Sequence, residues 1–203
     1  MFKWLLITSA AALLVGCTTP PRSGTVDGRR TIHFSGYDWW VKQSDHARGP
    51  GPNLFSDSDE SVWVDSKGQL HLTIEKREGK WNCTEVVTLK SLGYGNYTFE
   101  LDSPVHKLDP DAVIGLFTWS DAPEQNHREI DIEIGRWGDP TNHLGQFVIQ
   151  PYDRTGNMQR FAIPAGVRHA AFTFEWGAGR HRIPRNQRPV SALVWTGGRA
   201  LEV

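Results

Sequence analysis

Short runs in which apolar and polar residues alternate follow one another along most of the chain. The clearest is "SVWVDSKGQLHLTIEKRE", residues 61–78, in which valines alternate before residues 66–68 and leucines and an isoleucine alternate after them. The Ser-Lys-Gly between the two halves has the composition of a turn. A period of two puts every second side chain on one face of a strand, so this segment predicts a β-hairpin.

Similar runs recur along the rest of the chain, and patterns typical of helices are almost absent. Short strands with turn residues between them predict an all-β fold, an antiparallel β-sandwich or jelly roll. A parallel α/β sheet would need helical crossovers, which the pattern does not contain. Without internal repeats or a second linker, we expect one domain over residues 31–203. The runs occupy residues 85–91, 95–104, 113–121, 129–135, 144–153, 159–165 and 169–176.

The N-terminus has the pattern of a targeting segment. Residues 1–3 supply a basic start, and residues 4–15 form an apolar run that is too short to span a bilayer. The sequence Leu14-Val15-Gly16-Cys17 resembles the lipobox of bacterial lipoproteins. That resemblance implies removal of a signal peptide, residues 1–16, and attachment of lipid to Cys17. The alternative is a plain secretory signal with an incidental cysteine.

Residues 17–30 are rich in proline, glycine, serine and charge, which is typical of a tether between a lipid anchor and a folded domain. The lipoprotein resemblance implies a protein of the cell envelope that contacts the membrane through lipid on Cys17. It would lie in the outer membrane if the host is Gram-negative, and an extracellular location is the other possibility.

Charge and cysteine content argue against several kinds of partner. The formal net charge is -1, which gives no electrostatic reason to expect nucleic acid. If Cys17 carries lipid, Cys83 has no partner for a disulfide within the chain, and we expect it to fill a buried apolar space. His127 and His143 flank an acidic segment, but no histidine pair has the close spacing of metal ligands. We expect no metal, no cofactor and a monomer.

That acidic segment, "EIDIEIG", carries the candidate chemistry. On a strand, Glu129, Asp131 and Glu133 share one face, while the isoleucines between them face a core. Asp and Glu are disfavoured in strands, and like charges on one face repel. The pattern therefore leaves two interpretations open, namely a costly solvent face or three carboxylates gathered for a reaction.

Retaining glycosidases need two carboxyl groups about 5–5.5 Å apart, one as nucleophile and one as acid/base. Residues four apart on a strand have Cα atoms roughly 13 Å apart, a gap that two glutamates leaning together across a concave sheet can close. An aspartate between them can orient the nucleophile. Three neighbouring carboxyl groups also split their pKa values, which would keep one glutamate protonated at neutral pH as an acid while the other stays ionised.

The segment Glu129-Ile130-Asp131-Ile132-Glu133 resembles the E-x-D-x-E signature of glycoside hydrolase family 16, in the form found in bacterial lichenases. Further similar segments are "NCTEVVTLKSLGYGNYTFEL", "VIGLFTWSD", "GQFVIQPY" and "HAAFTFEWGAGR", in the family's order. Coverage runs from about residue 34 to residue 179. The resemblance implies a concanavalin-like jelly roll with a sugar-binding cleft across its concave sheet.

The resemblance also implies roles for individual residues. Glu129 would be the nucleophile, Asp131 its partner and Glu133 the acid/base. A structural calcium occurs in the family, but the sequence gives no independent support for one here. The implied substrate-binding residues are Glu85, Gln150 and Tyr152, with Trp119 and Trp137 as stacking platforms for pyranose rings.

The family pattern ends near Arg180. Residues 181–203 are atypical because they begin with an arginine- and proline-rich stretch, and only residues 191–196, "SALVWT", have strand character. The terminal strands are therefore expected to be short or missing. A divergent ending and a change of reading frame near Arg180 both explain this.

The leading hypothesis is an endo-acting retaining glycoside hydrolase that cleaves a β-linked polysaccharide, with a β-1,3/1,4-glucan as the best guess. A transglycosylase is a close variant, because sugar as well as water can intercept a glycosyl-enzyme. A non-catalytic, lectin-like carbohydrate-binding module on the same fold is the alternative from a different class. A structural lipoprotein without a sugar role is the third.

Overall fold

The computed structural model describes residues 23–125, 129–178, 180–182 and 201–202. Its regular elements are nearly all strands, and the only helices among the described residues are two short 3₁₀ turns, η1 (Val105–Lys107) and η2 (Pro123–Gln125). The all-β fold predicted from the alternation is confirmed, and most strand pairs are antiparallel, whereas β5 with β9, β7 with β18 and β11 with β18 pair in parallel. The strands before residue 90 are β1 (Ser23–Val26), β2 (Arg29–Phe34), β3 (Tyr37–Val41), β4 (Ser44–Arg48), β5 (Asn53–Phe55), β6 (Val62–Val64), β7 (Leu70–Leu72), β8 (Glu75–Arg77), β9 (Lys80–Cys83) and β10 (Val86–Thr88).

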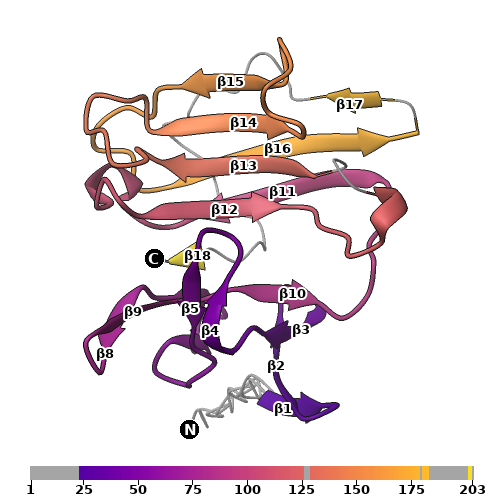
Figure 1. The fold of residues 1–203 in the computed structure, drawn as a ribbon, viewed down its shortest axis with the longest axis vertical. Coiled ribbons are helices and arrows are strands. Elements are labelled where there is room, and N and C mark those ends of the chain that lie inside the picture. The colour runs from indigo at the N-terminus through magenta and orange to yellow at the C-terminus, as the bar shows by residue number, and fades with distance from the viewer. Residues whose placement is uncertain (1–22, 126–128, 179, 183–200, 203) are drawn as a thin grey trace, which may run out of the picture.

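The later strands form the sandwich that carries the acidic segment. Four of them lie side by side in the order β12-β13-β14-β15, and they pack against β11 and β16 behind them (Figure 1). A core of isoleucine, leucine and phenylalanine fills the space between these two layers. The bounds of the later strands are β11 (Gly95–Leu101), β12 (Val113–Phe117), β13 (Ile130–Gly135), β14 (Gly145–Ile149), β15 (Met158–Phe161), β16 (Ala170–Gly177), β17 (Arg180–Arg182) and β18 (Leu201–Glu202).

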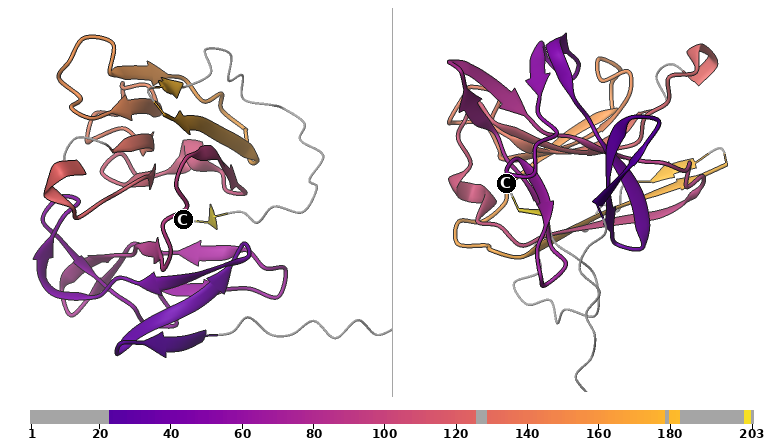
Figure 2. Two further views of the ribbon diagram at one scale, coloured as in Figure 1. Left: turned by 90° about the vertical axis from the view of Figure 1, so that its right-hand side faces the viewer. Right: turned by 90° about the horizontal axis from the view of Figure 1, so that it is seen from below.

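The earlier strands gather at the other end of the molecule, as Figures 1 and 2 show by the indigo and purple ribbons. They form one sheet in the order β1-β2-β3-β10 and another in the order β4-β5-β9-β8. Strands β6 and β7 belong to a longer sheet, β17-β16-β11-β18-β7-β6, which runs between the two ends. A second, separate core, built from Ile32, Phe34, Val41, Val62 and Leu70, lies among the earlier strands.

The predicted hairpin over residues 61–78 is confirmed in its central part. β6 and β7 pair antiparallel, with Val62 opposite Leu72 and Val64 opposite Leu70. The side chain of Asp65 accepts hydrogen bonds from the backbone amides of Lys67 and Gln69, which fixes the turn.

The tether predicted for residues 17–30 is wrong for its second half. β1 and β2 form a hairpin in which Val26 lies opposite Arg29, so residues 23–30 are part of the fold and not of a tether. The loop between these strands is Asp27-Gly28, and both residues have positive φ, 51° and 74°. An Asp-Gly pair suits such a two-residue hairpin loop because it tolerates this left-handed backbone.

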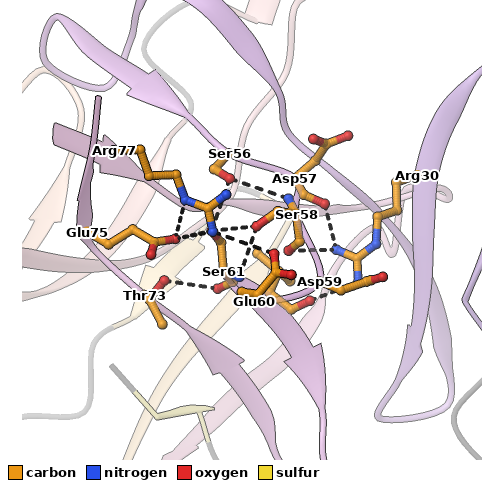
Figure 3. A network of polar contacts seen from close by, with 11 residues as sticks. Arg30, Ser56, Asp57, Ser58, Asp59, Glu60, Ser61, Thr73, Glu75 and Arg77 are labelled. Atoms are coloured by element: carbon orange, nitrogen blue, oxygen red, sulfur yellow. Dashed lines mark hydrogen bonds and ion pairs between the residues drawn. The ribbon is translucent and has the colours of Figure 1, made fainter. Parts of the chain in front are cut away.

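Arg30, at the end of the predicted tether, is anchored in the fold (Figure 3). Its guanidinium donates to the backbone oxygens of Asp57 at 2.9 Å and Val62 at 2.8 Å, and it forms an ion pair with Asp59 at 2.6 Å. A guanidinium group has five N–H donors in a rigid planar arrangement, so one arginine can bind several backbone oxygens of the loop before β6 and hold that loop in place. The signal peptide, Cys17 and the predicted strand at residues 191–196 lie outside the described residues.

Candidate active site

The three candidate carboxylates lie on and directly before β13. Glu129 precedes the first residue of the strand, and its carbonyl accepts a hydrogen bond from the amide of Gln150 at 3.0 Å, which extends the pairing by one position. The intervening isoleucines, Ile130, Ile132 and Ile134, are no more than 1% exposed. The alternation predicted from the sequence is therefore present, and the three acids share the face that points away from the core.

Asp131 differs from the sequence-based expectation of an open acidic face. Its side chain is only 5% exposed. Phe117 lies opposite it on β12 and Val148 on β14, so apolar side chains flank the carboxyl on both sides. The acidic face of β13 therefore points away from the core, but its central residue is largely shielded from solvent.

Burial raises the pKa of Asp131 to about 8, and the nearby charges of Glu129 and Glu133 add to this effect. Burial also raises the pKa of Glu129, which shares a side-chain hydrogen bond with Asp131. That hydrogen bond raises the pKa of Asp131 and lowers that of Glu129, so the shared proton belongs to Asp131. With its pKa at about 8, Asp131 is mostly protonated at neutral pH and donates this hydrogen bond to Glu129, whereas the sequence-based expectation placed the retained proton on a glutamate.

The adjacent strand β14 supplies two glutamines to the acidic face. Gln150 forms a side-chain hydrogen bond with Asp131. Gln146 lies directly opposite Glu133, and its Nε2 donates to Glu133 Oε2. The sequence-based prediction included Gln150 and missed Gln146. The available signal was the spacing, because Gln146 and Gln150 are four residues apart on one strand and so share a face.

The expected aromatic platforms lie at the ends of strands in this sheet. Trp119 comes two residues after β12 and is 66% exposed, with its indole nitrogen donating to Asp121 Oδ1 at 2.9 Å. Trp137 follows β13 with a positive φ of 51°, and the guanidinium of Arg160 lies 4.4 Å from the centre of its ring. Arg160 is opposite Gln146 on β15. Trp137 and Arg160 therefore border the row that contains Glu133.

Tyr152 is 61% exposed in the loop after β14. Its amide donates to the side-chain oxygen of Gln150 at 3.1 Å, which links this loop to the residue that contacts Asp131.

Glu85, the remaining predicted sugar ligand, is held in an ion pair. Its Oε2 lies 2.7 Å from Nζ of Lys42, and both side chains are mostly buried. Lys42 also donates to the carbonyl of Gly49 at 2.6 Å and lies 4.2 Å from the centre of the Phe55 ring. Among the contacts of the described residues, Glu85 is bonded to this lysine and not to the carboxylates of β13.

Cys83 is half-buried, and burial raises the pKa of its thiol, which disfavours the nucleophilic thiolate. Within the described ranges, no group of three or more His, Cys, Asp or Glu side chains is placed to hold a metal ion. His143 is exposed, and His127 lies outside the described residues. In the same ranges, no helix is long and apolar enough to cross a bilayer.

Comparisons of the chain with protein-family models, with curated proteins and with solved structures gave no significant match. A buried neutral carboxyl lies between two glutamates, it donates to one of them, and a glutamine holds the other. This arrangement provides one oriented carboxylate, one separately held carboxyl and nearby exposed aromatic rings.

Proposed function

We propose that this protein is a retaining glycoside hydrolase that cleaves within a β-linked polysaccharide. The observation that carries the proposal is the buried carboxyl of Asp131, 5% exposed, which shares a hydrogen bond with the side chain of Glu129. A nucleophile must be ionised and correctly oriented, and a neutral donor at its side supplies the orientation without adding a second charge.

In the first step, the carboxylate of Glu129 bonds to the anomeric carbon while the glycosidic bond breaks. Glu133 gives its proton to the departing oxygen. In the second step, water loses a proton to Glu133 and attacks the same carbon, which frees Glu129. The exposed rings of Trp119 and Tyr152 suit the apolar face of a pyranose at the rim of the site.

The test is to incubate the purified full-length chain with lichenan, laminarin, agarose, carrageenan and xyloglucan and to measure new reducing ends. We expect turnover on one of them, with a mixed-linkage β-glucan as the first choice. The Glu129→Gln variant should lose on the order of 10³-fold or more of that activity while keeping its fold by circular dichroism.

Hydrolysis by Glu129→Gln near the wild-type rate would show that the nucleophile is misassigned. If the wild type hydrolyses none of these polysaccharides but binds one of them, a lectin-like module would be favoured instead. Sugar-acceptor products in place of reducing ends would indicate a transglycosylase.

We further propose that Cys17 carries lipid and attaches the protein to the cell envelope. The supporting observation is the Leu-Val-Gly-Cys sequence that ends an apolar run of signal-peptide length. Metabolic labelling with a radioactive fatty acid should mark the wild type and leave Cys17→Ser unlabelled. Labelling of both to the same extent would contradict the anchor.

A further inference from the structure

Gln146 is a buried amide in the middle of the acidic face. Its side chain is only 5% exposed. The register of β13 and β14 puts it directly opposite Glu133, and the register of β14 and β15 puts Arg160 on its other side. Backbone pairing on both sides of β14 therefore fixes the position of the Gln146 Cα atom and the face on which its side chain lies.

The two ends of the amide are used unequally. Nε2 donates to Glu133 Oε2. Oε1 is fully buried, and within the described part of the chain no donor forms a hydrogen bond with it. A buried acceptor without a partner costs about 1–3 kcal/mol, so an apolar side chain of the same size would serve stability better. Since Glu133 is only half-buried, water could solvate it without the glutamine.

We propose that Gln146 is a positioning residue that holds Glu133 in both of its protonation states. This role rests on the proposed function, in which Glu133 gives up a proton in the first step and takes one in the second. The ionised carboxylate accepts from Nε2. The protonated carboxyl needs an acceptor, and Oε1 becomes that acceptor when the amide turns over.

Turning the side-chain amide of Gln146 costs little hydrogen bonding. Because its Oε1 has no hydrogen bond among the described residues, turning the amide breaks only the bond to Glu133, which the new orientation replaces. An amide is suited to this because it carries a donor and an acceptor of similar reach. Displacing a catalytic carboxyl by about 1 Å from its productive position can lower the reaction rate roughly 100-fold. A contact that holds Glu133 in place can therefore have a large effect on the rate.

The test compares Gln146→Met with the wild type on 2,4-dinitrophenyl glycosides of the oligosaccharide that the wild type releases. Methionine keeps the size of the side chain and removes both hydrogen-bonding groups. Dinitrophenolate leaves without a proton, so the first step needs no general acid. The rate of the initial burst of dinitrophenolate should therefore stay within about 3-fold of the wild-type rate. Steady-state turnover needs Glu133 as base and should fall about 10–100-fold.

Azide attacks the glycosyl-enzyme without giving up a proton, and the carboxylate of Glu129 leaves as the new bond forms. Added azide should therefore restore the turnover of Gln146→Met and yield a glycosyl azide. The melting temperature should be unchanged or higher. The control is Gln69→Met, which removes a similar bond, Gln69 Nε2 to Asp102 Oδ2 at 2.9 Å, away from the acidic face. It should leave burst and turnover unchanged.

A burst that falls as much as the turnover, a lack of azide rescue, or a lowered melting temperature that accounts for the lost activity would each overturn the role of Gln146. Those results leave the wild-type enzyme active, so they are distinct from a failure of the proposed function. A wild type that produces no burst and cleaves no polysaccharide would overturn the proposed function and this role together.

Discussion

The carboxyl of Asp131 donates a hydrogen bond to the side chain of Glu129, two residues earlier on the same face of the sheet. Two ionised carboxylates in that position would repel in a largely dry environment. The proton on Asp131 turns this repulsion into a hydrogen bond. The acidic face is thus a donor–acceptor pair beside a third, separately held carboxyl, rather than three equivalent charges.

We expect the free energy of unfolding to fall as pH rises from about 4 to 8. Asp131 ionises near 3.8 when unfolded and near 8 when folded, so between these values the folded protein holds the extra proton. Each unit of such a shift corresponds to about 1.4 kcal/mol. The raised pKa of Glu129 acts in the same direction.

The variant Asp131→Asn should remove most of this slope and should gain stability over wild type as the pH rises from 5 to 8. Urea unfolding at four pH values measures both curves. Asp153→Asn, in the exposed loop after β14, makes the same chemical change outside the site. Its curve of unfolding free energy against pH should be parallel to that of the wild type. Parallel curves for Asp131→Asn as well would mean that Asp131 is ionised in the folded protein.

The ion pair of Glu85 with Lys42 gives a second prediction. Glu85→Gln should lower the free energy of unfolding by up to about 3 kcal/mol, because it leaves the mostly buried ammonium without its counter-charge. Replacing both residues by methionine should recover most of that loss. Thermal melts of the single and double variants measure it.

The double variant also tests whether Glu85 binds sugar. If its role is confined to the ion pair, the recovered protein should have a wild-type KM. A KM that rises several-fold at wild-type stability would instead make Glu85 a sugar ligand.

Trp119 is expected to bind substrate without supporting the fold. Its ring is 66% exposed, so Trp119→Ala should change the free energy of unfolding by less than about 0.5 kcal/mol. Loss of one stacking platform should raise KM roughly five-fold, equivalent to about 1 kcal/mol. Trp63→Ala is the matched control, because Trp63 stacks on His71 in β7 at 4.5 Å, on another sheet. Equal effects of the two variants on KM would exclude a specific platform.

Gly145 should not tolerate a larger residue. A Cβ at this position would overlap the ring of Phe161, which stacks on Phe147 at 4.5 Å in the core. We expect Gly145→Ala to cost about 1–3 kcal/mol, measured by urea unfolding. Gly95→Ala, on β11, meets no atom within 4 Å and should have little effect. A neutral Gly145→Ala would show that Phe161 has room to move.

Alternation was enough to predict most of the later strands and the isoleucine face of β13, because a period of two depends only on local sequence. It predicted no strand over residues 23–55, where β1 to β5 lie, or over residues 80–83, where β9 lies. The loop before β2, Asp27-Gly28, and the loop before β9, Glu78-Gly79, have positive φ at each residue. The Asp-Gly pair was a readable hairpin signal that the charged surroundings obscured.

The candidate site was predictable in its composition but not in its electrostatics. The sequence places Glu129, Asp131 and Glu133 on one face. Their protonation depends on which residues lie opposite them on β12 and β14, and that register is a tertiary property. The burial of Asp131 by Phe117 and Val148, and the pairing of Gln146 with Glu133, both follow from it.

Because the fold has two separate cores, we expect the molecule to lose its structure in two steps. The core of Ile32, Val62 and their neighbours shares no residue with the core behind β13. Amide hydrogen exchange should therefore show two protection classes, one for the strands before residue 90 and one for β11 to β16. A protein built in this way can open its N-terminal end while the strand that carries the carboxylates keeps its amides protected.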